Sequence, residues 1–448
     1  MKRKLVYFGI PLLILFSIYL YALPLLETGT GYAAKMMCSC LYVHNTESSL
    51  ETMQAERLNF SVLSQISLQH DAEEKSVHTS FYGLAGQEAK FIPGRGCVMV
   101  ADQNKPLPAG IEVAPPPLSQ VASDLSLQPD STTMAGVDLN KLAEAIDFGM
   151  APVPGGGAHA IVVLRNGQLL TERYAEGITA DARLLGWSMT KSITAGLLGM
   201  RVASGDIDLN KRPVFTEWQG TAEQPDPRET ISLTNLLRMN SGLRWNEAYG
   251  SVSDATIMLH DQVSMANYVM KQPLAEPPAT HWMYSSGTTN LLMEKVARSF
   301  VDKEALIRWI HDSLFYPIGA NSFIIETDQR GLPVGSSYGW ARARDWAKMG
   351  QLYLQNGRWG DRQIIPAAWI DYIRQPAEDS EGIYGGQIWL PGPDMPSLPQ
   401  DAFMFRGFQD QRVFMIPSKQ LVIVRLGHNV DKATDFDGLV ARVLAAVS

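Results

Sequence analysis

The chain has 448 residues, of which 46% are hydrophobic and 19% are charged. This length suggests two or three folding units, and the apolar content excludes a mostly disordered chain. The formal net charge of −8 argues against a nucleic-acid partner, and three cysteines are too few for a disulfide-dense scaffold.

The N-terminus has the pattern of a membrane anchor. Three cations at positions 2–4 precede an uncharged run over 5–26. As a helix this run would be about 33 Å long, close to the ~30 Å hydrocarbon thickness of a bilayer. The cations predict a cytoplasmic N-terminus. We therefore expect a single-pass signal anchor over 1–30 in the inner or plasma membrane, with the rest of the chain on the periplasmic or extracellular side. Cleavage of a signal peptide after Ala33 is the alternative.

All three cysteines lie in the first hundred residues, in the part of the chain that we expect outside the cytoplasm. Disulfides persist in such compartments. We expect one disulfide between Cys97 and either Cys38 or Cys40, with three free thiols as the alternative. No clustered histidines or second cysteine pair accompany them, so we expect no metal and no cofactor.

Residues 31–100 are expected to form a small β-rich module. Segments 61–68, 77–82 and 97–100 alternate apolar and polar residues in the way short strands do. Proline, serine and glutamine then become frequent, which predicts a proline-rich linker over 101–136.

The remaining chain, 137–448, is expected to be one large domain. Apolar segments flank Asn166-Gly167 near its start and 417–420 near its end, and both patterns predict β-hairpins. Helical patterns lie between and after them, at 188–204, 232–239, 286–300, 303–314, 342–355, 366–374 and 431–447. Strands at both ends with a helical middle predict an α+β fold in which helices cover an antiparallel sheet.

Ser188 and Lys191 are the first candidate catalytic residues. They stand three positions apart at the start of a predicted helix, so their side chains share a face. Serine becomes a nucleophile when a base takes its proton, and a buried lysine of lowered pKa is such a base. The helix start also offers free N–H groups for a developing oxyanion. The spacing by itself is weak, because it also recurs by chance.

Tyr284 is the third candidate, just before a helix expected to start at 286. Its hydroxyl can relay a proton between nucleophile and leaving group if a nearby lysine charge makes the ionised form accessible. A packed aromatic ring with a hydrogen-bonded hydroxyl is the alternative.

Three segments together resemble the serine β-lactamase/penicillin-binding superfamily. Ser-Met-Thr-Lys at 188–191, Leu-Leu-Arg-Met-Asn-Ser-Gly-Leu at 236–243 and Tyr-Ser-Ser-Gly at 284–287 follow its order and approximate spacing. The chain is most similar to the class C β-lactamase-like branch, and there to the esterases and 6-aminohexanoate-dimer hydrolases, over about 140–448. Segment 336–347 is also typical of them. The resemblance implies a β-lactamase/transpeptidase-like fold with an all-helical subdomain.

The resemblance also implies residue roles. Ser188 would be the acylated nucleophile and Lys191 its base. Tyr284 would protonate the leaving group and help to activate water. The family's third motif, Lys-Thr-Gly or a relative, best matches Phe-Arg-Gly at 405–407. The amide of Phe408 would then pair with that of Ser188 as the oxyanion hole.

Two departures from the family pattern narrow the substrate. The motif Tyr-x-Asn ends here in Ser286, which offers a hydroxyl in place of an amide. Phe405 replaces the third-motif lysine that meets a carboxylate in β-lactam and peptidoglycan substrates, although Arg406 beside Gly407 can supply a charge. The resemblance therefore favours a serine hydrolase acting on a small-molecule or peptide-like ester or amide.

Two other functions remain open. Ser337 lies in a Gly-x-Ser-x-Gly pattern typical of α/β-hydrolases, with Asp361 and His428 downstream in triad order. The polar turn at 326–333 stands where that fold needs a buried strand. The second alternative is a catalytically inactive protein of the same fold that binds cell-wall peptides.

Overall fold

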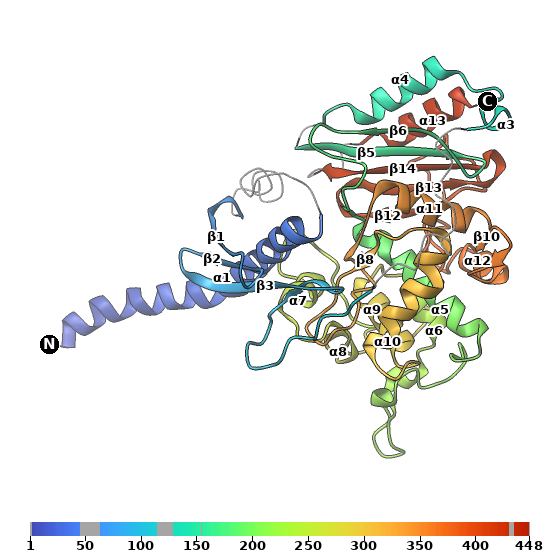
Figure 1. The fold of residues 1–448 in the computed structure, drawn as a ribbon. Coiled ribbons are helices and arrows are strands. Elements are labelled where there is room, and N and C mark those ends of the chain that lie inside the picture. The colour runs from blue at the N-terminus through green and yellow to red at the C-terminus, as the bar shows by residue number, and fades with distance from the viewer. Residues whose placement is uncertain (1, 45–62, 114–128, 154, 430–433, 448) are drawn as a thin grey trace.

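The computed structural model describes residues 2–44, 63–113, 129–153, 155–429 and 434–447 (Figure 1). Parts of the predicted segments lie outside the described residues. These are residue 1 of the anchor, 45–62 of the β-rich module with the start of its first expected strand, 114–128 of the linker, and 154, 430–433 and 448 of the large domain, which include 431–433 of the last expected helix.

The first and last strands of the large domain meet in one antiparallel sheet of order β12-β13-β14-β5-β6. Its strands are β5 (Gly156–Arg165), β6 (Gln168–Tyr174), β12 (Phe403–Gly407), β13 (Gln411–Ile416) and β14 (Leu421–Asn429). The predicted hairpins join β5 to β6 and β13 to β14. Segments from the beginning and the end of the large domain lie side by side here, because β14 pairs with β5, for example Val424 with Val162. The predicted α+β fold with an antiparallel sheet is confirmed.

Helices cover both faces of this sheet, which explains why every residue of β13 and β14 is buried. On one face α4 (Leu139–Met150) and α13 (Phe436–Ala446) pack on Ile161 and Val163 of β5. On the other face α11 (Ala343–Leu354) packs on Val162 and Leu164. Strands covered on both faces read as continuous apolar runs, as these do.

Most of the remaining helices of the large domain lie on the α11 side of the sheet (Figure 1). Those at predicted positions are α5 (Thr190–Ala203), α6 (Leu233–Leu237), α9 (Ser286–Ala297), α10 (Lys303–Ile310) and α12 (Ala367–Ile373). The sequence did not predict α3 (Ser131–Met134), α4, α7 (Asp254–Asp261) or α8 (Met265–Met270). A small sheet is formed by β7 (Leu184–Leu185), β9 (Gly339–Ala341) and β8 (Ile324–Ile325). It contacts the start of α5, where the Gly339 amide donates to the Thr190 hydroxyl at 2.9 Å.

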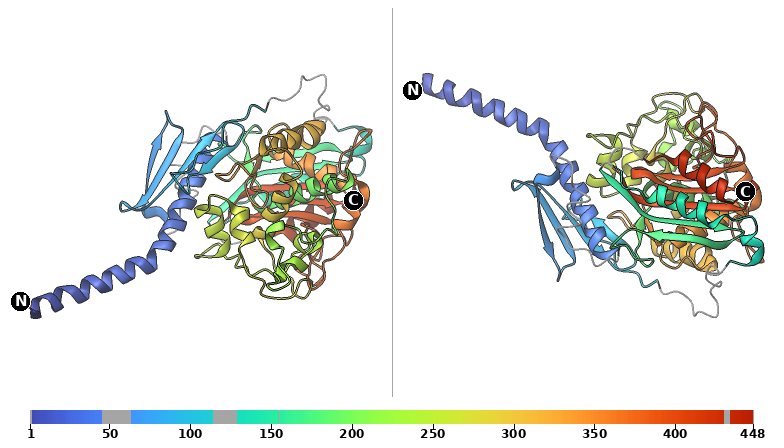
Figure 2. Two further views of the ribbon diagram at one scale, coloured as in Figure 1. Left: turned by 90° about the horizontal axis from the view of Figure 1, so that it is seen from below. Right: turned by 90° about the horizontal axis from the view of Figure 1, so that it is seen from above.

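The N-terminal region contains one long helix and a small sheet. The sheet is antiparallel in sequential order, β1 (Ile66–Asp71), β2 (Ser76–Phe81), β3 (Leu84–Ile92) and β4 (Gly96–Met99). The helix α1 (Lys2–Tyr42) includes residues 31–42, which the sequence assigned to the β-rich module. Its first half projects from the molecule, and its second half passes between the small sheet and the large domain (Figure 2).

Among the described residues, no helix combines the length and the apolar character that crossing a membrane requires. The structure therefore does not support the anchor expected over 1–30, which stays a prediction.

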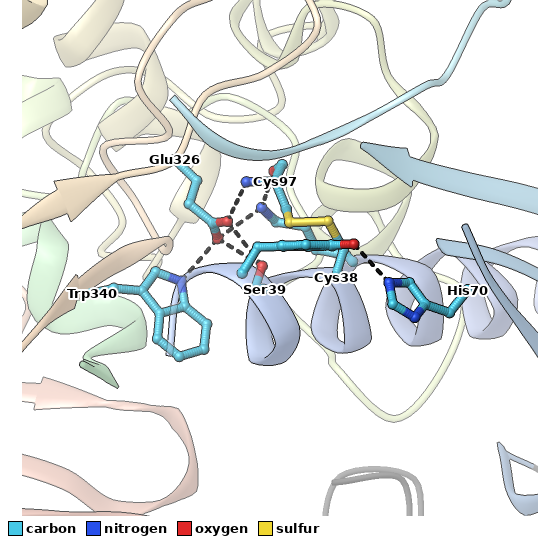
Figure 3. Close-up of a disulfide and its surroundings, with 8 residues drawn as sticks. Cys38, Ser39, His70, Cys97, Glu326 and Trp340 are labelled. Atoms are coloured by element: carbon cyan, nitrogen blue, oxygen red, sulfur yellow. Dashed lines mark hydrogen bonds and ion pairs between the residues drawn. A yellow bond between two sulfur atoms is a disulfide. The ribbon is translucent and has the colours of Figure 1, made fainter. Parts of the chain in front are cut away.

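Covalent and ionic contacts fix the second half of α1. Cys38 forms a disulfide with Cys97 of β4, so of the two pairings left open the structure has this one, and the buried Cys40 stands outside it (Figure 3). The ammonium of Lys35, which is 1% exposed, lies 2.7 Å from the carboxylate of Glu326 in the large domain.

Glu326 binds residues from three elements, α1, β4 and β9. Its carboxylate also accepts hydrogen bonds from the Ser39 hydroxyl at 2.8 Å, the Cys97 amide at 2.7 Å and the Trp340 indole at 2.8 Å (Figure 3). A buried carboxylate is tolerated only with such partners, so α1 and β4 complete the surroundings of a large-domain residue.

Candidate active site

Ser188 lies in a single turn, Trp187–Met189, immediately before α5. Trp187 has a φ of 48°, a left-handed backbone that is rare for a bulky residue. Its indole N–H donates to Gln409 Oε1 at 3.0 Å. The centre of its ring lies 5.5 Å from the centre of the Phe408 ring. These contacts from the far end of the chain hold the turn that presents Ser188.

Lys191 is buried beside the nucleophile. Its Nζ lies 3.0 Å from Ser188 Oγ, 2.8 Å from Ser286 Oγ and 2.9 Å from the carbonyl oxygen of Ser336. Burial lowers the pKa of Lys191 to about 8. A neutral amine has two N–H groups and one lone pair. It can donate to Ser336 and Ser286 and accept the proton of Ser188, which is the arrangement of a general base.

Tyr284 lies against the same pair of residues. Ser188 is near enough to its hydroxyl to lower the pKa of Tyr284, and Lys191 Nζ lies 5.0 Å from the centre of its ring. Burial and the charge of Glu247 raise the pKa of Tyr284 well above its usual value, against the lowering effects of Ser188 and of Arg406. This direction opposes the ionised form that the proton relay was expected to use, because desolvation outweighs the nearby cations. The role of Tyr284 as proton donor to the leaving group stays a prediction.

Glu247 and Tyr249 join the site from the loop after α6, and the sequence did not indicate them. The Glu247 carboxylate accepts from the Ser286 amide at 2.8 Å, the Ser286 hydroxyl at 2.5 Å, the Tyr249 hydroxyl at 2.6 Å and the Trp245 indole at 2.5 Å. Ser286 thus links Glu247 to Lys191. A glutamate in a loop without a known motif gives no signal in a single sequence.

The end of β12 lies against the nucleophile turn. A Cβ atom added to Gly407 would lie 2.1 Å from the carbonyl oxygen of Gly186, so only glycine permits this approach. The Arg406 guanidinium lies 4.4 Å from the centre of the Trp389 ring. Phe408 packs on Trp187. The structure therefore brings segment 405–408 to Ser188, and the pairing of the Ser188 and Phe408 amides as an oxyanion hole stays a prediction.

The alternative triad does not fit the structure. Ser337 is 2% exposed and its hydroxyl lies 2.8 Å from that of Ser336, whereas Asp361 is exposed in the turn between β10 (Arg358–Trp359) and β11 (Arg362–Gln363). A triad aspartate is buried against its histidine. The sheet is antiparallel, while α/β-hydrolases need a parallel one. In the part of the chain that the structure describes, no cluster of three or more metal-ligating side chains is present.

Comparisons with known proteins agree with this geometry. A family model described as Beta-lactamase matches residues 149–447. The 6-aminohexanoate-dimer hydrolase of Paenarthrobacter ureafaciens is 24% identical over 318 residues, which cover 64% of this chain and 77% of that protein.

Solved structures share the fold at low identity. A variant of a class C β-lactamase has a TM-score of 0.54 at 14% identity and covers 70% of this chain and 99% of its own. A family VIII carboxylesterase has a TM-score of 0.53 at 15% identity, with coverage of 72% and 98%. The predicted resemblance is confirmed. Because the family model covers most of the chain, this protein belongs to the beta-lactamase family and is a hydrolase.

Proposed function

We propose that this protein hydrolyses an ester or amide bond through an acyl-enzyme on Ser188. The observation that carries the proposal is the 3.0 Å contact between Lys191 Nζ and Ser188 Oγ, made by a lysine whose pKa burial lowers to about 8. A serine with a neutral amine at this distance has the base that nucleophilic attack requires.

In acylation, Lys191 takes the proton of Ser188 while Oγ attacks the substrate carbonyl carbon. The amides of Ser188 and Phe408 would hold the oxyanion. Tyr284 gives its proton to the leaving oxygen or nitrogen as the bond breaks, and the Lys191 ammonium returns a proton to Tyr284. In deacylation a water attacks the acyl carbonyl, its proton passes to the same groups, and Ser188 leaves with its proton restored.

The substrate class is inferred from the residues that would contact the substrate. The third-motif position holds Phe405, which is buried in the core. Arg406 lies over Trp389, and it is the residue of this segment that can meet a negative charge on a substrate. The relatives named as a 6-aminohexanoate-dimer hydrolase and a carboxylesterase support small amides and esters.

We also propose that the protein works outside the cytoplasm, on the periplasmic or extracellular side of the membrane. The disulfide between Cys38 and Cys97 supports this location, because such bonds persist in oxidising compartments.

A fluorophosphonate probe with peptide mapping tests the function. We expect the label on Ser188, its loss in Ser188→Ala and its retention in Ser337→Ala. We also expect Ser188→Ala to lower kcat for a simple ester by at least about a thousandfold. Absence of labelling in the folded protein would favour the inactive peptide-binding alternative, and labelling of Ser337 would reverse the assignment.

A further inference from the structure

A cavity of about 330 Å³ lies between the active site and the N-terminal region. Its active-site wall is made by Trp187, Tyr249 and Phe408. Trp187 precedes the nucleophile. The Phe408 ring packs on Trp187 and stacks on Tyr249, with ring centres 5.5 Å and 5.1 Å apart. The cavity wall therefore includes the residue that precedes Ser188 in the chain.

The opposite wall comes from the N-terminal region. Leu26 and Tyr32 of α1, together with Ile66 of β1 and Phe81 of β2, line it. The disulfide and the Lys35 ion pair described above fix α1 at this place. The large domain by itself therefore supplies only part of the cavity.

The cavity offers no charge to a ligand. Among the described residues that line it there is no acidic residue, lysine or arginine. His260 is the one lining histidine in this set, and burial lowers its pKa to about 3, which leaves the ring neutral at physiological pH. Its ring packs edge-on against Tyr32 at 5.8 Å. An apolar group is therefore the ligand that gains most from burial here.

The residues that pack on Tyr284 differ from those that line the cavity. The group that protonates the leaving group must lie on the leaving-group side. The Tyr284 ring contacts Tyr384 at 5.9 Å and Trp389 at 5.4 Å, and neither residue lines the cavity. The cavity wall is therefore distinct from the aromatic residues that pack on Tyr284, and the acyl group is the part of the substrate left for it.

We propose that this cavity binds an apolar acyl group of the substrate, and that helix α1 thereby helps to select the substrate. The inference rests on the proposed acyl-enzyme chemistry at Ser188. The volume corresponds to about eleven water molecules at ~30 Å³ each, so it suits a medium-length acyl chain.

The full-length protein is tested with p-nitrophenyl esters from acetate to decanoate. We expect kcat/KM to rise about threefold to fourfold for each methylene that enters the cavity, and to level off once it is full. A second series keeps an acetyl group and lengthens an aliphatic alcohol, and we expect no comparable rise. A rise with alcohol length alone would move the cavity to the leaving-group side and overturn the assignment.

Two variants change the cavity without touching the catalytic groups. Ser251 is exposed and lines the cavity, so Ser251→Trp should fill it. Leu25 of α1 is 50% exposed, so Leu25→Glu should place a charge in its wall without emptying a core. We expect each to lower kcat/KM for the decanoate ester at least about tenfold and to leave the acetate ester within about twofold.

The matched control is Val301→Glu, which introduces the same charge at an apolar residue that is 91% exposed and lies outside the cavity wall. It should leave both esters unchanged. Equal losses on acetate and decanoate in the cavity variants would contradict the inference. If the proposed acyl-enzyme function were wrong, no ester at all would be hydrolysed in a Ser188-dependent way. This result differs from equal losses on both esters and so separates the two failures.

Discussion

One proton on Lys191 decides whether Ser188 can attack. Burial lowers the pKa of Lys191 to about 8, and only the neutral amine accepts a proton. We predict that kcat/KM for an ester rises about tenfold per pH unit below pH 8 and levels above it. A profile measured from about pH 6 to pH 10 checks this. Lys191→Arg should be inactive throughout, because a guanidinium stays charged. A flat profile would contradict the role of Lys191 as base.

Glu247 acts on this proton from a distance. Its negative charge raises the pKa of Lys191 and so opposes the larger effect of burial. We predict that Glu247→Gln moves the acid limb of the pH profile to lower pH, because the ammonium form loses a stabilising charge. The exposed Glu176→Gln is the matched control and should leave the limb in place. Lower activity with an unmoved limb would mean that Glu247 only holds the loop.

At the scale of elements, the disulfide joins α1 to β4 across a sequence separation of 59 residues. Closing a loop of this length removes conformational freedom from the unfolded chain, and the expected stabilisation is about 4 kcal/mol. We predict that a reductant lowers the melting temperature measured by circular dichroism. The double variant Cys38→Ala/Cys97→Ala should melt at the reduced protein's temperature and show no further response. An identical melting temperature with and without reductant would disprove the stabilising role.

Local sequence patterns were enough to predict some helices and strands and insufficient to predict others. The hairpin at Asn166-Gly167 and the helix that starts at Ser286 follow from turn chemistry, period and capping, all of which lie within a few residues. The second half of α1 does not, because it is fixed by Lys35 and its partner Glu326, which is remote in sequence. The same holds in the site. Ser188 and Lys191 are neighbours along the chain and were predicted, whereas Glu247 reaches them only through the fold.

At the scale of the whole molecule, the Lys35–Glu326 pair couples the N-terminal region to the large domain. Lys35→Met would leave the carboxylate buried without its cation, which costs about 3–5 kcal/mol. We predict this loss in the free energy of unfolding, measured with urea. Glu326→Gln combined with Lys35→Met should recover part of it, because the remaining donors can bond to a neutral amide. An unchanged midpoint in Lys35→Met would show that the two regions are stable independently.

The contact between Gly186 and Gly407 has a consequence for how such an enzyme changes over evolutionary time. This contact is made between backbone atoms of the nucleophile turn and the end of β12. It needs no particular side-chain rotamer, so it persists when side chains other than those that hold the turn are replaced. Substitutions in the cavity wall away from Trp187 and Phe408 can therefore explore new acyl groups while this backbone contact is inherited intact.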